Sequence, residues 1–535
     1  MNNNTIKDGD AMSGNEPTGA RRRRKTKVAV FLGFAGLCAT GASLIPLAGS
    51  TQAATTPETE GMVCTFDSAP TVVAGVTHEA FDLTAVDGYT SEPDGNAIYD
   101  WGYANSGEGK AFQLPGPVLC VNQGEVVDVT LHNSLAVNTS IQFPGQEGVT
   151  SNLAPVGPVA DPAGNLVSLV PEAIPGGSVK YSFTAGRAGT YVYESGSDPQ
   201  LQVQMGLFGA IVVRPTYLGA VIKPDATAIL AIPADGPTGV TTNAARGMTT
   251  AEAGNAVADA ACAYASTTDA SKCDPLAIYN GKRENILMLS EVDPGLHSFM
   301  EQNKTTAANL TWNAYPGAYE AHYFMINGRS MPDTIAPNFA PWMPSQPYGA
   351  MAHVQPWDPH LNPLDAMLRY VGVGVTGYDF HPHSNHEHVI AEDGALMKGT
   401  TIGTAATGND NTEEKFNIMV APGSTVDATF RWTNEEHYAD TDGSRLPVAW
   451  PNGLNLKEGD FWSGSPYLGE SGVLNAGILT KTQCGEYYHV AHSHDLTQAT
   501  NYGITFGGML TLIKVEPPDN VQGTTQGTVS VPVCK

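Results

Sequence analysis

The run Glu125-Val-Val-Asp-Val-Thr-Leu131 is rich in β-branched residues, which favour the extended conformation of a strand. Further runs of this kind lie between residues 64 and 215, separated by turns rich in Gly, Pro and Asn. They are Val118–Val121, Ser178–Phe183, Thr190–Tyr193 and Ala210–Arg214. We therefore predict a β-sandwich of Greek-key size over residues 64–215.

A second series of strand-like runs follows between residues 285 and 517. These runs are Asn285–Ser290, Tyr323–Ile326, Met367–Val373, Phe416–Val420, Val426–Trp432, Gly485–Val490 and Met509–Val515. About seven strands are expected of one sandwich. Residues 216–284 between the two series are predicted to be a connector with an insertion, holding a short helix or a loop closed by Cys262 and Cys273. Residues 518–535 form a C-terminal tail.

The composition also indicates an all-β protein. Only 15% of the residues are charged, whereas 58 Gly and 37 Pro favour many turns and short strands. A chain of 535 residues is too long for one ordinary core. We favour two tandem sandwich domains, and three domains are the alternative.

Residues 1–53 have the pattern of an export signal. A basic run that starts at Arg21 precedes an apolar stretch from Val28 to Ala48, and small residues suited to signal-peptidase cleavage follow. We expect cleavage and export to the periplasm or the extracellular space, with no membrane span left in the mature chain. A retained membrane anchor is the alternative reading.

Removal of residues 1–53 takes away seven basic and three acidic residues and changes the formal charge from −26 to −30. Such a charge repels nucleic acid, so we exclude nucleic-acid binding. An even number of cysteines in an exported chain indicates disulfides, up to three here, and the sequence cannot choose their pairing. The six remaining cysteines are Cys64, Cys120, Cys262, Cys273, Cys484 and Cys534.

Seven of the 14 histidines lie in two short windows. The first window holds His381, His383, His386 and His388, and the second holds His489, His492 and His494. Imidazole is a common ligand of copper, zinc and iron, and alternate residues of a strand share one face. Pairs spaced as His-x-His on neighbouring strands would supply three or four nitrogens to one metal. Hydrogen-bonded or surface histidines are the alternative.

The order of several motifs along the chain resembles that of the multicopper oxidases. The motifs are 114–119 (LPGPVL), 137–145 (VNTSIQFPG), 189–196 (GTYVYESG), 204–215 (QMGLFGAIVVRP), 325–334 (MINGRSMPDT), both histidine windows and 507–510 (GGML). The resemblance runs from about Cys64 to Val515. It implies tandem cupredoxin-like domains, a mononuclear copper with a Cys ligand, and a trinuclear cluster held by eight histidines in four His-x-His segments.

Much of that ligand set is missing here. Gln142 and Pro144 stand in the first segment, and Glu194 and Gly196 stand in the second, where the family has histidines. Ser384 replaces a histidine of the third segment, Ser493 replaces the copper-binding cysteine of the fourth, and Gln498 replaces the next histidine. A hydroxyl cannot form the Cu–S bond of a blue copper site, so we expect none.

The resemblance leaves a reduced set of candidate metal ligands, for one copper or a pair. These are His381, His383, His386, His492 and His494. Further candidates, as ligands or as groups that orient a ligand, are Glu194, His388, His489 and Met509. Copper is the expected metal, and zinc is the less favoured alternative.

Two functions remain open at this point. In the first, the protein is an exported oxidoreductase that oxidises a phenolic or metal-ion reductant with dioxygen as acceptor, as the resemblance implies. In the second, it is a non-catalytic copper-binding or structural cupredoxin protein with a reduced metal site. The resemblance to two-domain relatives also implies a homotrimer with the metal site shared between subunits; a monomer is the alternative.

Overall fold

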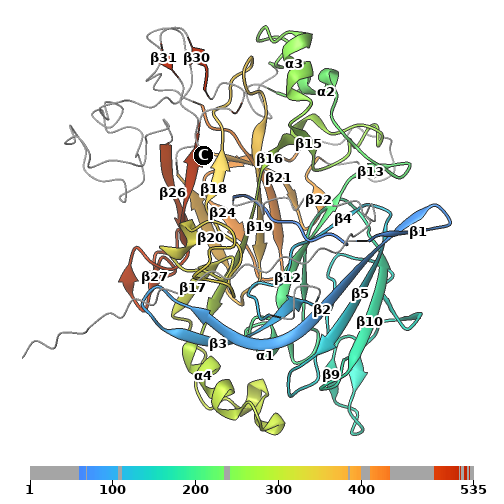
Figure 1. The fold of residues 1–535 in the computed structure, drawn as a ribbon, viewed down its shortest axis with the longest axis vertical. Coiled ribbons are helices and arrows are strands. Elements are labelled where there is room, and N and C mark those ends of the chain that lie inside the picture. Colours follow the sequence, from blue (N-terminus) through green and yellow to red (C-terminus); the bar gives the residue numbers. More distant parts are fainter. Residues whose placement is uncertain are drawn as a thin grey trace, which may run out of the picture. The chain divides into compact units, whose positions relative to one another are not determined.

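The computed structural model describes residues 60–67, 69–106, 111–233, 241–383, 386–398, 410–433, 487–516, 519, 523–526 and 529–530. The predicted signal segment, Cys484, Cys534 and most of the predicted tail lie outside the described residues. The fold is dominated by β-strands that form two β-sandwiches (Figure 1), and the prediction of an all-β fold is confirmed. Among the described residues, no helix is long and apolar enough to cross a membrane.

The first sandwich consists of a seven-stranded and a three-stranded sheet. The larger has the order β1-β2-β5-β10-β6-β7 with β3 beside β2, and the smaller has the order β11-β12-β4. Their bounds are β1 Thr71–Val73, β2 Val76–Ser91, β3 Ala97–Asn105, β4 Leu119–Asn122, β5 Val126–Asn133, β6 Thr150–Ser151, β7 Ala154–Pro155, β10 Ser178–Thr184, β11 Gly189–Glu194 and β12 Phe208–Arg214. Along β5, the buried Val127, Val129 and Leu131 alternate with partly exposed residues, so one face of this strand lines the core.

The second sandwich consists of an eight-stranded and a five-stranded sheet. The first has the order β15-β16-β19-β25-β21-β22, with β17 beside β16 and β23 beside β21, and the second has the order β18-β29-β26-β20-β24. Their bounds are β15 Ala260–Cys262, β16 Ile278–Val292, β17 Tyr323–Ile326, β18 Ala352–Val354, β19 Asp365–Gly372, β20 Tyr378–Pro382, β21 Glu387–Glu392, β22 Ala395–Leu396, β23 Glu413–Lys415, β24 Ile418–Val420, β25 Thr425–Phe430, β26 Tyr487–Ser493 and β29 Leu510–Val515.

The predicted connector holds two short helices, α2 (Ala226–Leu230) and α3 (Thr250–Ala256). Thr249 and Glu252 form a capping box that starts α3. The Cys262–Cys273 disulfide closes a loop behind α3, as the sequence suggested, and a second disulfide joins Cys64 to Cys120. The strand β16 begins at Ile278, seven residues before the predicted start of the second series. Its first three residues are part of the strand because they pair with Ala260–Cys262 of β15.

The two sandwiches share buried surfaces. Helix α4 (Pro294–Asn303) follows β16, yet its Leu296 and Met300 belong to the core of the first sandwich. The side chain of Asp293 accepts hydrogen bonds from Gly295 and Leu296 and caps this helix. Figure 1 shows α4 beside β3 of the first sandwich.

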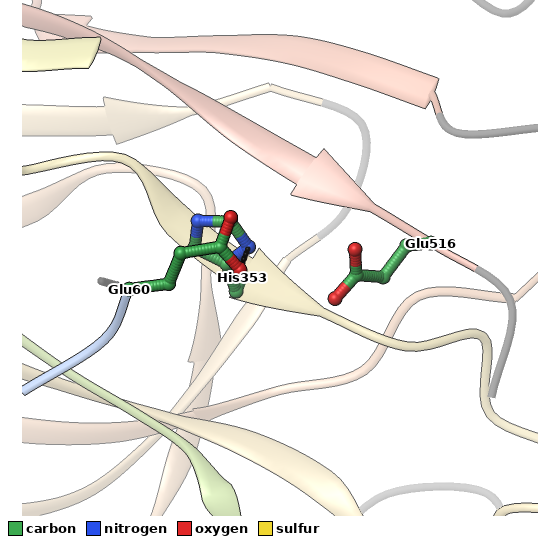
Figure 2. A group of neighbouring side chains, drawn as sticks. All are labelled: Glu60, His353 and Glu516. Atoms are coloured by element: carbon green, nitrogen blue, oxygen red, sulfur yellow. Dashed lines mark ion pairs between the residues drawn. The ribbon is translucent and has the colours of Figure 1, made fainter. Parts of the chain in front are cut away.

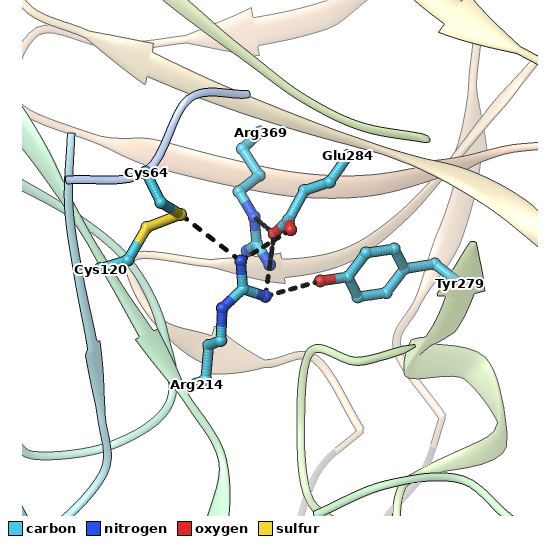
Figure 3. Close-up of a disulfide and its surroundings, with 6 residues drawn as sticks. All are labelled: Cys64, Cys120, Arg214, Tyr279, Glu284 and Arg369. Atoms are coloured by element: carbon cyan, nitrogen blue, oxygen red, sulfur yellow. Dashed lines mark hydrogen bonds and ion pairs between the residues drawn. A yellow bond between two sulfur atoms is a disulfide. The ribbon is translucent and has the colours of Figure 1, made fainter. Parts of the chain in front are cut away.

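A buried network of ion pairs also joins the sandwiches (Figure 3). Glu284 on β16 accepts from Arg214 of β12 at 2.9 Å and pairs with Arg369 of β19 at 2.7 Å. Arg369 also contacts Asp427 of β25 at 3.1 Å. Burial alone would raise the pKa of Glu284, but Arg214 and Arg369 outweigh it and lower that pKa to about 2. Glu284 is therefore ionised at neutral pH.

Candidate metal centre

The pairing of β20 with β26 brings the two histidine windows together. These strands are antiparallel, and His381 lies directly opposite His492. Just beyond the end of β20, the amide of His383 donates to the carbonyl of Val490 at 2.9 Å. Just beyond β26, the amide of His494 donates to the carbonyl of Asp379 at 2.6 Å. Backbone hydrogen bonds thus hold these four histidines next to one another.

The four imidazole rings form one cluster. The ring of His381 lies 4.6 Å from that of His383, 5.0 Å from that of His494 and 5.7 Å from that of His492, measured between centroids. The ring of His383 lies 5.2 Å from that of His492, and their Nε2 atoms are 3.1 Å apart. We call His381, His383, His492 and His494 the imidazole cluster. Of the five predicted ligands, the structure brings these four together.

Hydrogen bonds orient two of these rings. Nδ1 of His492 donates to the carbonyl of Ser493 at 2.7 Å, and Nδ1 of His381 donates to the carbonyl of Phe416. A carbonyl can only accept, so the proton sits on Nδ1 in both rings and Nε2 keeps its lone pair. Metal-binding histidines are commonly held in this way.

Burial favours the neutral form of two cluster histidines. The pKa of His383 is lowered to about 4, mainly by burial and further by the neighbouring His381 and His492. Burial also lowers the pKa of His492, although its bond to Ser493 opposes the effect. A neutral imidazole is the form that binds a metal, so these residues are ready ligands at neutral pH.

The cluster fits copper in donor chemistry and spacing. Two nitrogens bound to one metal at about 2.0 Å stand roughly 3 Å apart, and the Nε2 atoms of His383 and His492 already lie 3.1 Å from one another. An all-imidazole set suits copper or zinc. The residues present therefore fit one such ion, held by three or four imidazoles.

The remaining predicted histidines have other ring partners or lie on another sheet. The exposed His386 packs its ring against Phe416 at 5.5 Å. His388 lies on β21, which belongs to the other sheet of the sandwich. His489 is buried on β26 with its ring 6.0 Å from that of Trp432. Alternation along β26 places His489 on the opposite face of the strand from His492.

The family's mononuclear copper has no counterpart here. Ser493 faces the sandwich interior, and its Oγ donates to Oε1 of Gln498 at 2.6 Å. Both side chains are buried, and so is the neighbouring Met509. A hydroxyl and an amide that bond each other are poor ligands for copper, and neither can replace a thiolate or an imidazole. A blue copper site therefore does not fit these residues.

Gln142 and Glu194 occupy the family's first-sandwich ligand positions, but they bond each other. Their backbones exchange hydrogen bonds of 2.7 and 3.2 Å, and Nε2 of Gln142 donates to Oε1 of Glu194 at 2.9 Å. Burial raises the pKa of Glu194, against the effect of Gln142. Among the described residues, no hydrogen bond joins either side chain to the imidazole cluster. A ligand role for Glu194 stays a prediction.

Sequence comparison finds similarity to multicopper oxidases over part of the chain. Residues 102–217 match the multicopper oxidase family model. The probable nitrite reductase-hydroxylamine oxidoreductase fusion protein of Kuenenia stuttgartiensis is 35% identical over 133 residues, 24% of this chain and 14% of that protein. The laccase abr2 of Aspergillus fumigatus is 35% identical over 104 residues, 19% of this chain and 16% of that protein. The matched part of this chain thus covers a sixth or less of the length of these relatives.

Among solved structures, the blue copper oxidase of Nitrosomonas europaea is similar to this chain with a TM-score of 0.43 and 15% identity, covering 82% of this chain and 86% of that one. The family model and the curated relatives show that part of this chain, residues 102–217 in the family model, is similar to multicopper oxidases. Ser493 stands where the resemblance implies the copper-binding cysteine, and Gln142 and Glu194 stand where it implies histidines of the first sandwich.

One further cluster carried no sequence signal. Glu60, His353 and Glu516 meet at the edge of the second sandwich (Figure 2), although they come from three distant segments. No ligand spacing along the chain connects them, and His353 belongs to neither histidine window. Only the strand pairing of the folded chain brings such residues together.

Proposed function

We propose that the protein is an exported copper-binding protein whose imidazole cluster holds the metal. The observation that carries this proposal is the convergence of four imidazoles, with the Nε2 atoms of His383 and His492 3.1 Å apart. Similarity to the multicopper oxidases favours copper over zinc. His381 and His492 would bind through Nε2, because their Nδ1 atoms are engaged.

The reaction we propose first is oxidation of a phenolic or metal-ion reductant with dioxygen as acceptor. Bound copper would supply one-electron redox chemistry at the cluster. The chain's own residues orient His381 and His492, and the exposed Phe416, whose ring contacts that of His381, offers an apolar surface on which a phenol could rest. The family's usual entry point for electrons is lacking, since Ser493 and Gln498 replace its ligands.

A specific observation favours the second candidate, a copper-binding protein without oxidase turnover. Ser493 and Gln498, which stand where the resemblance implies copper ligands, form a hydrogen bond with each other. The first sandwich likewise presents an amide–carboxylate pair, Gln142 and Glu194, in place of imidazoles. On this reading the cluster binds copper for storage or structure.

Metal content and oxygen consumption separate these functions. The mature chain is dialysed against Cu²⁺, washed, and measured by elemental analysis and electron paramagnetic resonance. We expect about one copper per chain with nitrogen ligands and no intense copper–thiolate absorption. Less than one copper per chain contradicts the proposal. Copper without oxygen consumption on phenols, ferrous or manganous ions selects the non-catalytic function.

We also propose that a second copy of the chain covers the cluster in a ring-shaped assembly such as a homotrimer. The apolar side chains of Phe416, which contacts His381, and of Met419 and Leu496 are more than half exposed, which is typical of a surface that another subunit covers. Light scattering of the wild type and of Leu496→Asp tests this. A monomeric wild type contradicts the assembly and leaves the copper proposal standing.

A further inference from the structure

A second group of potential metal ligands lies at the edge of the five-stranded sheet, away from the histidine windows. His353 is on β18, Glu516 follows β29, and Glu60 is in the segment that leads to the first sandwich. Because β18 and β29 pair in parallel with His353 opposite Lys514, Glu516 comes to lie close to His353. One ligand atom from each of Glu60, His353 and Glu516 lies within 4.8 Å of the others (Figure 2).

The imidazole of His353 points into this group without a hydrogen bond at Nδ1. The residue is 2% exposed, and Nδ1 lies 3.0 Å from Oε2 of Glu60, yet it has no hydrogen-bond partner among the described residues. Figure 2 shows the two side chains facing each other. Burial, reinforced by Lys514 and Arg283, lowers the pKa of His353 well below its usual value. The ring is therefore neutral, with a buried ligand atom directed at a carboxylate.

A cavity leads to these side chains. Its volume is about 220 Å³, and Glu60 and His353 line it together with Pro337, Asn338 and Met351. This volume is enough for an ion and several waters, since one water takes up about 30 Å³. An ion can thus reach the group and complete its coordination with water.

The carboxylates already have cationic partners. Nζ of Lys514 lies 3.5 Å from Oε1 of Glu60 and 3.2 Å from Oε2 of Glu516. Arg283 reaches the other oxygen of Glu516 at 3.2 Å. The ammonium of Lys514 therefore bridges the two carboxylates, and a metal ion has to displace it to bind both.

We propose that Glu60, His353 and Glu516 bind a divalent first-row transition-metal ion such as Zn²⁺, in competition with the ammonium of Lys514. Two carboxylates and one imidazole form a ligand set that zinc accepts, with water completing the coordination. The lysine side chain is flexible and can turn toward solvent when the ion arrives. This site shares no residue with the imidazole cluster and does not depend on its copper.

The test compares Zn²⁺ binding by the wild type with that of three variants, using calorimetry and metal content after dialysis. Glu60→Gln and His353→Gln should each lose one equivalent of Zn²⁺. Lys514→Met should bind that equivalent at least about tenfold more tightly, because it removes one positive charge near the bound cation. His360→Gln, outside both groups, should bind Zn²⁺ as the wild type does.

Two results overturn the proposal. One is equal Zn²⁺ binding by the wild type, Glu60→Gln and His353→Gln. The other is binding in Lys514→Met alone, since the ammonium would then close the site in the natural chain. Glu60 is 41% exposed, so Glu60→Gln keeps the test valid if His353→Gln does not fold. Zinc should raise the thermal unfolding temperature of the wild type by more than that of Glu60→Gln, which keeps only the imidazole cluster.

Discussion

Oγ of Ser493 donates a 2.6 Å hydrogen bond to Oε1 of Gln498 inside the second sandwich, one residue from the cluster ligand His492. The strand β26 thus turns a candidate metal ligand toward one face and a hydrogen-bonded polar pair toward the other. One face presents the candidate ligand and the other packs in the interior. Substitutions can therefore test metal binding and stability separately.

Ser493→Ala should destabilise the protein and leave copper binding intact. Without the hydroxyl, Oε1 of Gln498 is buried and unsatisfied, which costs about 1–3 kcal/mol of unfolding free energy. Urea unfolding and copper content of the same samples provide the measurement. Loss of copper from a folded Ser493→Ala variant would instead show that the hydroxyl is a ligand.

His383→Gln should weaken copper binding by at least about 100-fold, because it removes a direct ligand from the centre of the cluster. His386→Gln is the matched substitution in the same window, and it should change the affinity less than about tenfold, since this ring packs on Phe416. Competition with a copper chelator measures both. Equal losses would place His386 among the ligands, as the sequence suggested.

Glu92→Gln should reduce the pH dependence of stability. Burial, together with Asp100, raises the pKa of Glu92 to about 8, although Ser330 opposes the shift. The folded state therefore keeps a proton that the unfolded state loses above about pH 4.5. Stability from this residue should fall between about pH 4.5 and 8, by up to about 1.4 kcal/mol per pH unit. Urea unfolding at pH 5 and 8 should show a smaller difference in the variant than in the wild type, and an equal difference would contradict the assignment.

Arg369→Met should destabilise the fold by about 3–5 kcal/mol, because Glu284 and Asp427 would stay buried with too little positive charge nearby. Lys180→Met removes the exposed pair with Asp128 and should cost less than about 1 kcal/mol. Chemical unfolding of both variants gives the comparison. Similar small losses would show that the network contributes little to stability.

The strands were predictable from sequence where β-branched residues gather. The runs at 126–133 and 208–214 are strands as expected, because half-buried strands require such side chains. Helix α4 was not expected: Pro294 and Gly295 signal a turn in sequence, yet they form the first turn of a helix that Asp293 caps. Its role in the core of the other sandwich depends on contacts that no local pattern contains.

The candidate site was predictable in part for a similar reason. The His-x-His spacing correctly placed His492 and His494 near His381, because alternation along strands is local. His381 lies on β20 of one sheet and His388 lies on β21 of the other, so a single histidine window supplies residues to two sheets. Which sheet a strand joins depends on tertiary packing. The same holds for Glu60, His353 and Glu516, whose grouping follows from strand pairing.

The insertion of Leu296 and Met300 into the first sandwich limits how this protein can be recombined. A chain cut before Pro294 leaves the first sandwich with a hole in its core where these side chains belong. The first sandwich could in principle be replaced by one from a relative that carries the four histidines implied by the resemblance. The exchange would work only if the new sandwich also accepts helix α4 in its core. The lost ligands are therefore easier to restore by point substitutions than by domain exchange.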